Sequence, residues 1–308
     1  MPFNIRQVAE KKSKFVSGHR SCTGCAFPNI VRTVLKATDD PVVVCCATGC
    51  LEVVSTIFPQ SSWNVPYIHN VFGASASTMS GVEAAWKALH KKGKAADNAK
   101  FVVFAGDGGS YDIGLQALSG MMERGHDVLY VLYDNEAYAN TGNQRSSATP
   151  FGAATTTSPV GSVHKGKQEF RKDITRVAVA HNIPYVAQAS CGHLPDLFNK
   201  AEKAFSIKGP KFLNVLSTCT LNWKHDPSMT IEVAKKAVSS CFWPLYEVEN
   251  GVYKLSHKPS SKIPVEEFLK MQGRYRHFLL EENRELLEKL QRNVDEEWGK
   301  LLRFCGEG

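Results

Sequence analysis

The amino-acid sequence predicts an α/β protein in which a parallel sheet carries helices on both faces. Two observations lead to this prediction. Short apolar runs typical of buried strands alternate along the chain with segments of helical periodicity. The chain is also large enough to bury such a sheet, with 308 residues of which 43% are hydrophobic. Because parallel sheets bind ligands at the carboxyl ends of their strands, we expect the functional site there.

The first expected strand, residues 41–48, is a β-branched apolar run that ends in Thr48-Gly49. Runs of the same character predict four further strands: residues 101–105, 128–134, 184–189 and 211–218. Helical patterns around these runs predict five helices: residues 28–37, 78–90, 113–124, 173–181 and 194–206. This order of elements favours right-handed strand–helix–strand connections within one sheet.

Two regions depart from the alternation. Residues 136–168 lack periodicity and are rich in Gly, Ser, Thr and Ala, and such a long irregular stretch is usually functional or disordered. Residues 265–302 are charged and helical in pattern. They carry an apolar stripe, which we expect to dock on this chain or on a neighbour: Phe268, Phe278, Leu279, Leu286, Leu287 and Leu290. We therefore expect a main domain over residues 1–250 and a C-terminal helical extension over residues 251–308.

Charge and hydropathy restrict the location and the partners. The chain has 37 basic and 30 acidic residues, a net charge of +7 that favours an acidic protein partner. The basic residues are spread along the chain without interleaved aromatics, so we expect no nucleic-acid binding. The longest apolar runs, residues 42–47 and 128–133, are far shorter than the about 18 residues of a membrane-spanning helix. Residues 1–15 lack the apolar centre of a signal peptide, so we expect a cytoplasmic protein that binds no membrane.

The chain contains nine cysteines, which the cytoplasm would keep reduced. Cys22 and Cys25 form a C-x-x-C pair in which Gly24 eases a tight turn, and Cys50 follows. Two thiolates of one turn are able to bind a single metal centre. From this spacing alone, zinc, an iron–sulfur cluster and a redox dithiol all remain open.

The strongest site signal lies where two expected strands end. Residues 101–105 lead directly into Gly106-Asp107-Gly108, where glycines let backbone amides face an anion. Asp107 is a hard oxygen ligand suited to a Mg²⁺ ion that bridges a diphosphate. The next strand ends at Asn135, 28 positions after Asp107. Neighbouring parallel strands would bring these two ends together, so Asp107 and Asn135 predict one cation site.

Gly106-Asp107-Gly108 followed at this distance by Asn135 resembles the motif with which thiamine diphosphate enzymes hold their cofactor. Six further segments narrow the resemblance: HRSCTGC from His19, ATGCLEV from Ala47, GLQALSG from Gly114, DNEAYANTG from Asp134, QRSSATP from Gln144 and TSPVG from Thr157. Together they resemble the β subunits of the 2-oxoacid:ferredoxin oxidoreductases, in the branch of the pyruvate and oxalate enzymes. The resemblance extends over about residues 19–246, and motifs of this length are highly specific.

The resemblance implies a fold that binds thiamine diphosphate, Mg²⁺ and a [4Fe–4S] cluster. It assigns the cluster to four thiolates: Cys22, Cys25, Cys50 and Cys219. It assigns Mg²⁺ to the side chains of Asp107 and Asn135 and to the carbonyl of Ala137. The residues implied around the cofactor are Thr48, Gly49, Gly106, Asp107, Gly108, Asn135 and Ala137. Asn140 matches a position that faces the substrate, and the other five cysteines match no ligand position.

The implied activity is oxidative decarboxylation of a small 2-oxo acid or of oxalate to CO₂. In such enzymes thiamine diphosphate accepts the electrons left by CO₂, and the cluster passes them on to ferredoxin. An acidic ferredoxin suits the charge of +7. In this family the glutamate that activates the cofactor comes from the α subunit. We therefore expect a catalytic β subunit that is inactive alone and assembles with α-, γ- or δ-type subunits.

Two departures from the family pattern bear on the substrate. After Phe72, pyruvate enzymes usually carry Glu-Asn, whereas this chain has Gly73-Ala74. Asn143 stands where an apolar residue or Gly is common. Losing a carboxylate and gaining a hydrogen-bond donor both favour a second negative charge. We therefore expect oxalate as the substrate, with Asn143 donating to its carboxylate, and oxidation of pyruvate to acetyl-CoA as the alternative.

Two other classes of protein compete with this interpretation. A non-catalytic zinc-binding module would use the four thiolates only to hold a fold together, and it gives Asp107 and Asn135 no role. A thiamine enzyme of the non-redox kind would leave the four cysteines idle. Visible absorbance separates these classes, because an anaerobically purified iron–sulfur protein is brown and a zinc protein is colourless.

Overall fold

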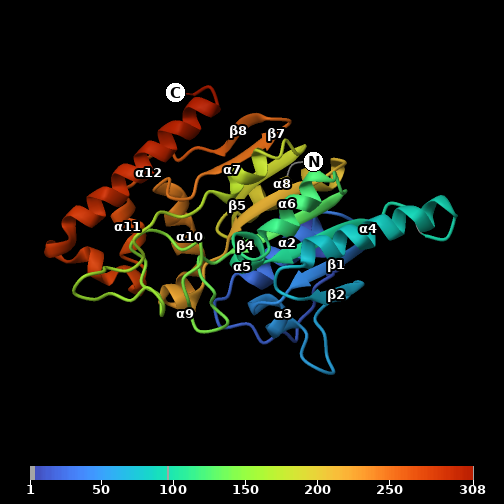
Figure 1. Cartoon of the computed structure of the whole chain (residues 1–308), viewed down its shortest axis with the longest axis horizontal. Helices are drawn as coiled ribbons and strands as arrows, with labels where there is room; N and C mark the ends of the chain where they lie inside the picture. Colours follow the sequence, from blue (N-terminus) through green and yellow to red (C-terminus); the bar gives the residue numbers. More distant parts are fainter. Residues whose placement is uncertain (1–3, 96, 308) are drawn as a thin grey trace.

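The computed structural model describes residues 4–95 and 97–307, and it confirms the α/β prediction. The strands form one sheet in the order β2-β1-β3-β4-β6-β5-β7-β8 (Figure 1). Their bounds are β1 (Val42–Ala47), β2 (Tyr67–Asn70), β3 (Lys100–Ala105), β4 (Val128–Asp134), β5 (Tyr185–Ser190), β6 (Lys211–Leu216), β7 (Leu245–Glu249) and β8 (Val252–His257). The first six strands in this order, from β2 through β5, run parallel to one another. Strands β7 and β8 add an antiparallel hairpin at the β5 edge.

Helices cover both faces of the sheet, because successive side chains of each strand point to opposite faces. Leu129, Val131 and Tyr133 of β4 pack in one core with α2 (Phe27–Lys36) and α8 (Leu194–Ser206). The alternate residues of β4 pack on the other face, against the elements α4 (Ser75–Lys91), α6 (Leu115–Glu123) and α7 (Ile174–Val179). None of the helices in the described part of the chain combines the length and apolar character that a membrane crossing requires.

The remaining helices are mostly short and lie at the ends of the strands or beyond the sheet. They are α1 (Ile5–Glu10), α3 (Cys50–Ser55), α5 (Asp107–Ser110), α9 (Thr220–Trp223), α10 (Thr230–Ser239), α11 (Val265–Leu269) and α12 (Arg284–Phe304). Three 3₁₀ turns complete the set: Pro227–Met229, Gly273–Leu279 and Glu281–Asn283. Three of the short helices, α3, α5 and α9, begin directly after the carboxyl ends of β1, β3 and β6, where we expected the site.

The five predicted strands and five predicted helices are present, with bounds shifted by a few residues. Strands β2, β7 and β8 were missed. Strand β2 is four residues long and only half-buried, so its pattern is weak. Strands β7 and β8 are joined by Asn250-Gly251, both with positive φ, which is the usual turn of a two-residue hairpin. Asn250-Gly251 is therefore the local sequence signal for this hairpin.

The C-terminal segment, residues 265–302, packs on its own chain. Docking on this chain was one of the two alternatives expected from its apolar stripe, and docking on a neighbour was the other. Four members of the apolar stripe are buried in a core shared with Trp223 and Trp243: Phe268, Phe278, Leu287 and Leu290. Leu279 is exposed and Leu286 is half-buried. The segment is broken into α11, two 3₁₀ turns and α12, which lies along one end of the molecule (Figure 1). Strand β8 belongs to the same sheet as the earlier strands, and the domain division at residue 250 stays a prediction.

One glycine is required where the chain turns into α6. A Cβ atom on Gly114 would lie 1.8 Å from the backbone oxygen of Gly109, which has no side-chain freedom to move away. Gly114→Ala must therefore displace the turn after Asp107, and we expect it to lower the free energy of unfolding by about 1–3 kcal/mol. In urea unfolding the midpoint should fall while the m-value stays constant.

Gly81→Ala is the matched control for this substitution. Gly81 lies in the middle of α4 on its solvent-exposed side, and a Cβ atom there meets no other atom within 4 Å. Alanine should therefore stabilise the helix by about 0.5–1 kcal/mol. A similar midpoint for the two variants would contradict the role given to Gly114.

Candidate active site

The carboxyl ends of β3 and β4 meet at one edge of the sheet, as the sequence predicted. These strands are parallel neighbours, with Ala105 opposite Leu132. Asp107 begins α5 directly after β3, and Asn135 follows the last residue of β4. Both side chains are buried, with 3% and 4% of their surface exposed. Asp107 and Asn135 thus lie at the ends of two neighbouring strands, on the same edge of the sheet.

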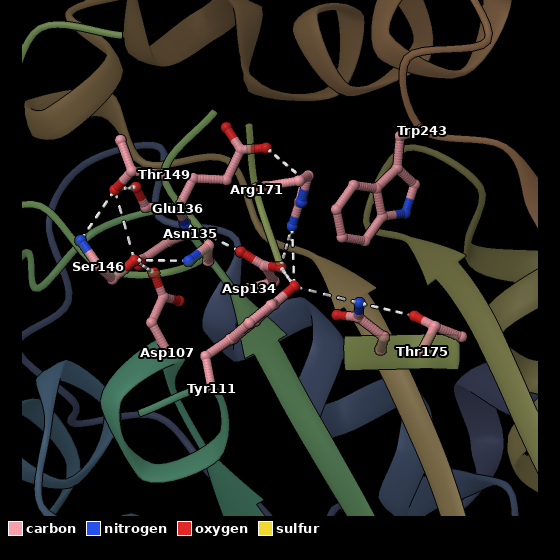
Figure 2. Close-up of polar contacts among 12 residues, drawn as sticks. Asp107, Tyr111, Asp134, Asn135, Glu136, Ser146, Thr149, Arg171, Thr175 and Trp243 are labelled. Carbon is pink, nitrogen blue, oxygen red and sulfur yellow. Dashed lines mark hydrogen bonds and ion pairs between the residues drawn. The ribbon is translucent and has the colours of Figure 1, made fainter. Parts of the chain in front are cut away.

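The carboxylate of Asp107 is only half satisfied by the protein. Its Oδ2 atom accepts a hydrogen bond of 2.8 Å from the hydroxyl of Ser146 (Figure 2). Its Oδ1 atom is buried and has no hydrogen-bond partner among the described residues. Burial and the nearby carboxylate of Asp134 raise the pKa of Asp107 well above its usual range. A buried oxygen ligand without a partner fits a hard divalent cation such as Mg²⁺.

Asn135 is held in place by two residues of α9, the helix that follows β6. Its backbone oxygen accepts hydrogen bonds from the indole N–H of Trp223, at 2.9 Å, and from the side chain of Asn222, at 3.3 Å. Its side-chain oxygen accepts from the backbone N–H of Ala137 at 3.4 Å. Trp223 and Asn222 belong to α9, which begins directly after Cys219. The segment that carries Cys219 is therefore attached to the same edge as Asp107.

Gly108 allows the close packing around α5. A Cβ atom at this position would lie 2.1 Å from the ring of Phe72 and 2.4 Å from the ring of Tyr138. The two rings come from the loop after β2 and from the loop at residues 136–168, which contains no helix or strand. Both irregular loops therefore converge on the residues that follow β3.

Hydrogen bonds tie the C-x-x-C turn to the chain after Cys219. The turn closes with a bond of 3.0 Å from the backbone N–H of Cys25 to the oxygen of Cys22. The hydroxyl of Thr220 donates to the oxygen of Thr23, and the hydroxyl of Thr230 donates to the oxygen of Gly24. These contacts bring Cys22 and Cys25 together with a segment almost 200 positions away in the sequence.

The four predicted cysteines lie within electrostatic reach of one another. Burial raises the pKa of Cys25 to about 12, and the charges of Cys219 and Cys22 contribute to this rise. Burial also raises the pKa of Cys50, with contributions from Cys219, Cys25, Cys22 and Asp107. Among residues 4–95 and 97–307, no three His, Cys, Asp or Glu side chains surround a point that could hold a single metal ion.

Two other predicted site residues lie beside this group. Thr48 and Gly49 join the end of β1 to α3, whose first residue is Cys50. The hydroxyl of Thr48 lies 2.8 Å from a ring nitrogen of His69 and 3.1 Å from the backbone oxygen of Asn70. The end of β1 is therefore fastened to the end of β2 at the same carboxyl edge.

Asn140 and Asn143 lie in the loop at residues 136–168. Asn140 is exposed and Asn143 is half-buried. Asn143 has a φ of +62°, a left-handed conformation in which Asn is one of the favoured residues. This backbone conformation is a reason for Asn at position 143 that does not involve the substrate.

A buried network of ion pairs next to Asn135 was not predicted (Figure 2). Arg171 bonds to Asp134 at 2.5 Å and to Glu136 at 2.9 Å, and its guanidinium lies over the ring of Trp243. Arg274 donates to the other oxygen of Glu136. The partners are separated by 35 to 138 positions, so no local pattern shows the pairing. The only sign of this network in the sequence is that two acidic residues, Asp134 and Glu136, flank Asn135.

Comparison with known proteins gives a consistent result. The family described as "Thiamine pyrophosphate enzyme, C-terminal TPP binding domain" matches residues 44–215. Pyruvate synthase subunit PorB of Thermotoga maritima is 50% identical over 98% of this chain and 96% of its own length. Ketoisovalerate oxidoreductase subunit VorB of Pyrococcus abyssi is 42% identical over 96% of this chain and 94% of its own length.

A solved structure, the 2-oxoglutarate:ferredoxin oxidoreductase from Magnetococcus marinus, has a similar fold. The TM-score is 0.58 at 19% identity, and the match covers 73% of this chain and 81% of that one. The near full-length relatives, rather than this distant structure, decide the family. The sequence motifs, the carboxyl edge with Asp107 and Asn135, and these relatives agree: the chain belongs to the β-subunit family of the 2-oxoacid:ferredoxin oxidoreductases.

Proposed function

We propose that this chain binds thiamine diphosphate, Mg²⁺ and one [4Fe–4S] cluster, and that it oxidises pyruvate in complex with partner subunits. The observation that carries this proposal is the position of Cys50. Its thiol interacts electrostatically with the other three predicted cluster cysteines and also with Asp107. A redox cluster and a diphosphate-binding carboxylate would therefore be neighbours in one polypeptide, which is the arrangement that an electron-transferring thiamine enzyme needs.

Asp107, Asn135 and the carbonyl of Ala137 would hold Mg²⁺ against the diphosphate. The unpartnered Oδ1 atom of Asp107 supports this role, because a cation would offset the cost of burying that oxygen. Thr48, Gly49, Gly106 and Gly108 would line the cofactor, and Asn140 would face the substrate. When bound, thiamine diphosphate supplies the electron sink for decarboxylation. The residues of this chain bind and orient it and exclude water from the buried edge.

Cys22, Cys25, Cys50 and Cys219 would hold the cluster. A cube of iron and sulfide takes one thiolate at each of its four iron corners, so its ligands stand farther apart than those of a single ion. The electrostatic contact of Cys25 and Cys50 with the other proposed ligands supports a shared site for the four thiolates. Burial raises the pKa of Cys25 to about 12, so a bound cation would favour the loss of its thiol proton.

The relatives favour pyruvate over the oxalate that we expected from Gly73-Ala74 and Asn143. Those described above are named for pyruvate and ketoisovalerate, and they give the oxalate preference no support. The positive φ of Asn143 also weakens the argument that its amide was selected for a second carboxylate. We therefore propose pyruvate, with acetyl-CoA as the product when coenzyme A is the acceptor.

Further subunits complete the proposed enzyme. The relative from Thermotoga maritima is named as a subunit, and the two chains match over nearly their full lengths. We propose that an α-type subunit supplies the activating glutamate and that other subunits lead electrons to an acidic ferredoxin. The isolated chain would then bind its cluster but oxidise no substrate.

Anaerobic purification of the full chain, with analysis of iron, sulfide and zinc, tests the cluster. We expect a brown protein with about four irons per chain. Cys219→Ser should lower the iron content and the visible absorbance. Cys241→Ser is the matched control, because Cys241 is a buried cysteine without a proposed ligand role. A colourless chain that contains zinc would contradict the proposal and favour a structural zinc module.

A substrate panel on the assembled complex, with a viologen dye as electron acceptor, tests the reaction. We expect pyruvate to be oxidised with a higher kcat/KM than 2-oxoisovalerate or oxalate. Oxalate as the best substrate would restore the preference expected from the sequence and would contradict the proposal.

A further inference from the structure

Tyr133 lies between the two parts of the proposed site. It is the next-to-last residue of β4, and its side chain points to the face of the sheet that carries α2. Its ring lies 2.9 Å from the position that a Cβ atom would take on Gly106, and its hydroxyl oxygen lies 3.1 Å from the corresponding position on Gly49. Phe27 packs on the ring, with centroids 4.6 Å apart. The ring therefore fills the space between the residue before Asp107 and the residue before Cys50.

The hydroxyl of Tyr133 is buried without a partner. The residue is 2% exposed, and its oxygen makes no hydrogen bond with any residue that the structure describes. Two other buried tyrosines of the sheet are satisfied: Tyr130 donates to the oxygen of Gly109, and Tyr185 donates to Glu247. Leaving a buried hydroxyl unpaired costs stability, because the group loses its hydrogen bonds to water. A phenylalanine would fill the same space without this cost, so the hydroxyl points to an acceptor supplied from outside the polypeptide.

The acceptor that fits lies on the side of Cys50. A tyrosine hydroxyl keeps its proton at neutral pH and acts as a donor. Its oxygen approaches Gly49, which is bonded directly to Cys50, more closely than it approaches Gly106, where the distance to the Cβ position is 3.5 Å. Both glycines would line the cofactor, and the shorter distance is the one on the side of Cys50. A sulfur atom near Cys50 is therefore taken as the acceptor, with an oxygen of the diphosphate as its competitor.

We infer that Tyr133 is a positioning residue whose hydroxyl donates a hydrogen bond to the cluster sulfur on the side of Cys50. The inference rests on the proposed function, since it needs the cluster to be present. A hydrogen bond to a sulfur stabilises the additional negative charge of the reduced cluster. Tyr133 thus makes the cluster easier to reduce and links its position to the strand end that carries Asn135.

The test is a redox titration of the full chain, loaded anaerobically with iron and sulfide and followed by electron paramagnetic resonance. Tyr133→Phe keeps the ring and removes only the hydroxyl. We expect its equilibrium constant for one-electron reduction to fall about tenfold, which is about 59 mV toward more negative potential. The cluster-free variant should unfold at the same temperature as the cluster-free wild type or slightly higher, because the lost hydroxyl has no protein partner.

Tyr185→Phe is the matched control, since Tyr185 is a buried tyrosine of β5 that packs in the same core as Tyr133. It removes a hydroxyl bonded to Glu247, so it should lower the thermal stability and leave the potential unchanged. An unchanged potential in Tyr133→Phe at full iron content would overturn the inference. Weaker binding of thiamine diphosphate with an unchanged potential would also overturn it, because the acceptor would then be the diphosphate. A wild-type chain that takes up no iron would instead refute the proposed function itself.

Discussion

Asp107→Asn should abolish cofactor-dependent activity while leaving the cofactor-free chain at least as stable as the wild type. The substitution removes the charge that the proposed Mg²⁺ ion needs and keeps the size of the side chain. Because the ligand contacts the metal directly, the loss of thiamine diphosphate affinity should exceed the roughly 10–100-fold typical of an outer-shell partner. The loss of activity in the assembled enzyme should be at least as large.

The stability of the same variant should depend on pH in a defined direction. Burial and Asp134 raise the pKa of Asp107 in the folded chain above the value of about 3.9 in the unfolded chain. The folded state therefore binds this proton more tightly, and the wild type loses stability as pH rises from about 4 through the folded pKa. Asn carries no such proton, so the stability of Asp107→Asn relative to the wild type should increase over that range.

Thermal unfolding of the cofactor-free chain at several pH values, and titration with thiamine diphosphate and Mg²⁺, measure these two effects. Asp39→Asn is the control, because Asp39 is an exposed partner of Lys11 at the opposite end of the strands. It should change neither cofactor affinity nor the pH profile. A large loss of stability in Asp107→Asn at neutral pH would show that Asp107 serves the fold rather than the cofactor.

The parts of the site that the sequence predicted depend on local patterns and a general rule of topology. Apolar runs locate β3 and β4, and neighbouring parallel strands end at one edge. Asp107 and Asn135 follow those runs directly, so their meeting requires only that the two strands be neighbours. The position of Cys219 required the family resemblance, because the hydrogen bonds from Thr220 and Thr230 to the C-x-x-C turn cross almost the whole chain.

The parts that the sequence did not predict are contacts between side chains that are distant along the chain. Tyr133 is one apolar member of a strand in the sequence, and only the approach of Gly49 and Gly106 shows what its hydroxyl faces. Arg274 lies in a charged C-terminal segment, where a solvent-exposed role is the usual one for arginine. Its burial follows from the way that segment folds back onto the end of β4, which no periodicity records.

Glu136→Gln should cause one of the largest losses of stability available to a single substitution in this chain. Glu136 is fully buried, and its two oxygens accept from Arg171 and from Arg274, which is itself buried. Arg274 also lies over the ring of Trp223, at 4.2 Å, and Trp223 holds the backbone of Asn135. The ion pair therefore holds the C-terminal segment against the carboxyl edge of the sheet, where Asp107 and Asn135 are proposed to bind Mg²⁺. Removing one partner leaves a buried charge uncompensated, which costs about 3–5 kcal/mol.

A double-mutant cycle with Arg274→Met separates the ion pair from simple loss of packing. Each single variant should unfold at a lower denaturant concentration with a constant m-value. The double variant Glu136→Gln/Arg274→Met should cost less than the sum of the two singles, with a coupling of about 0.5–3 kcal/mol. Glu307→Gln, which breaks the exposed pair with Lys258, should cost less than about 1 kcal/mol. Additive losses in the cycle would mean that Glu136 and Arg274 act independently, and the C-terminal segment would then be held by its apolar core alone.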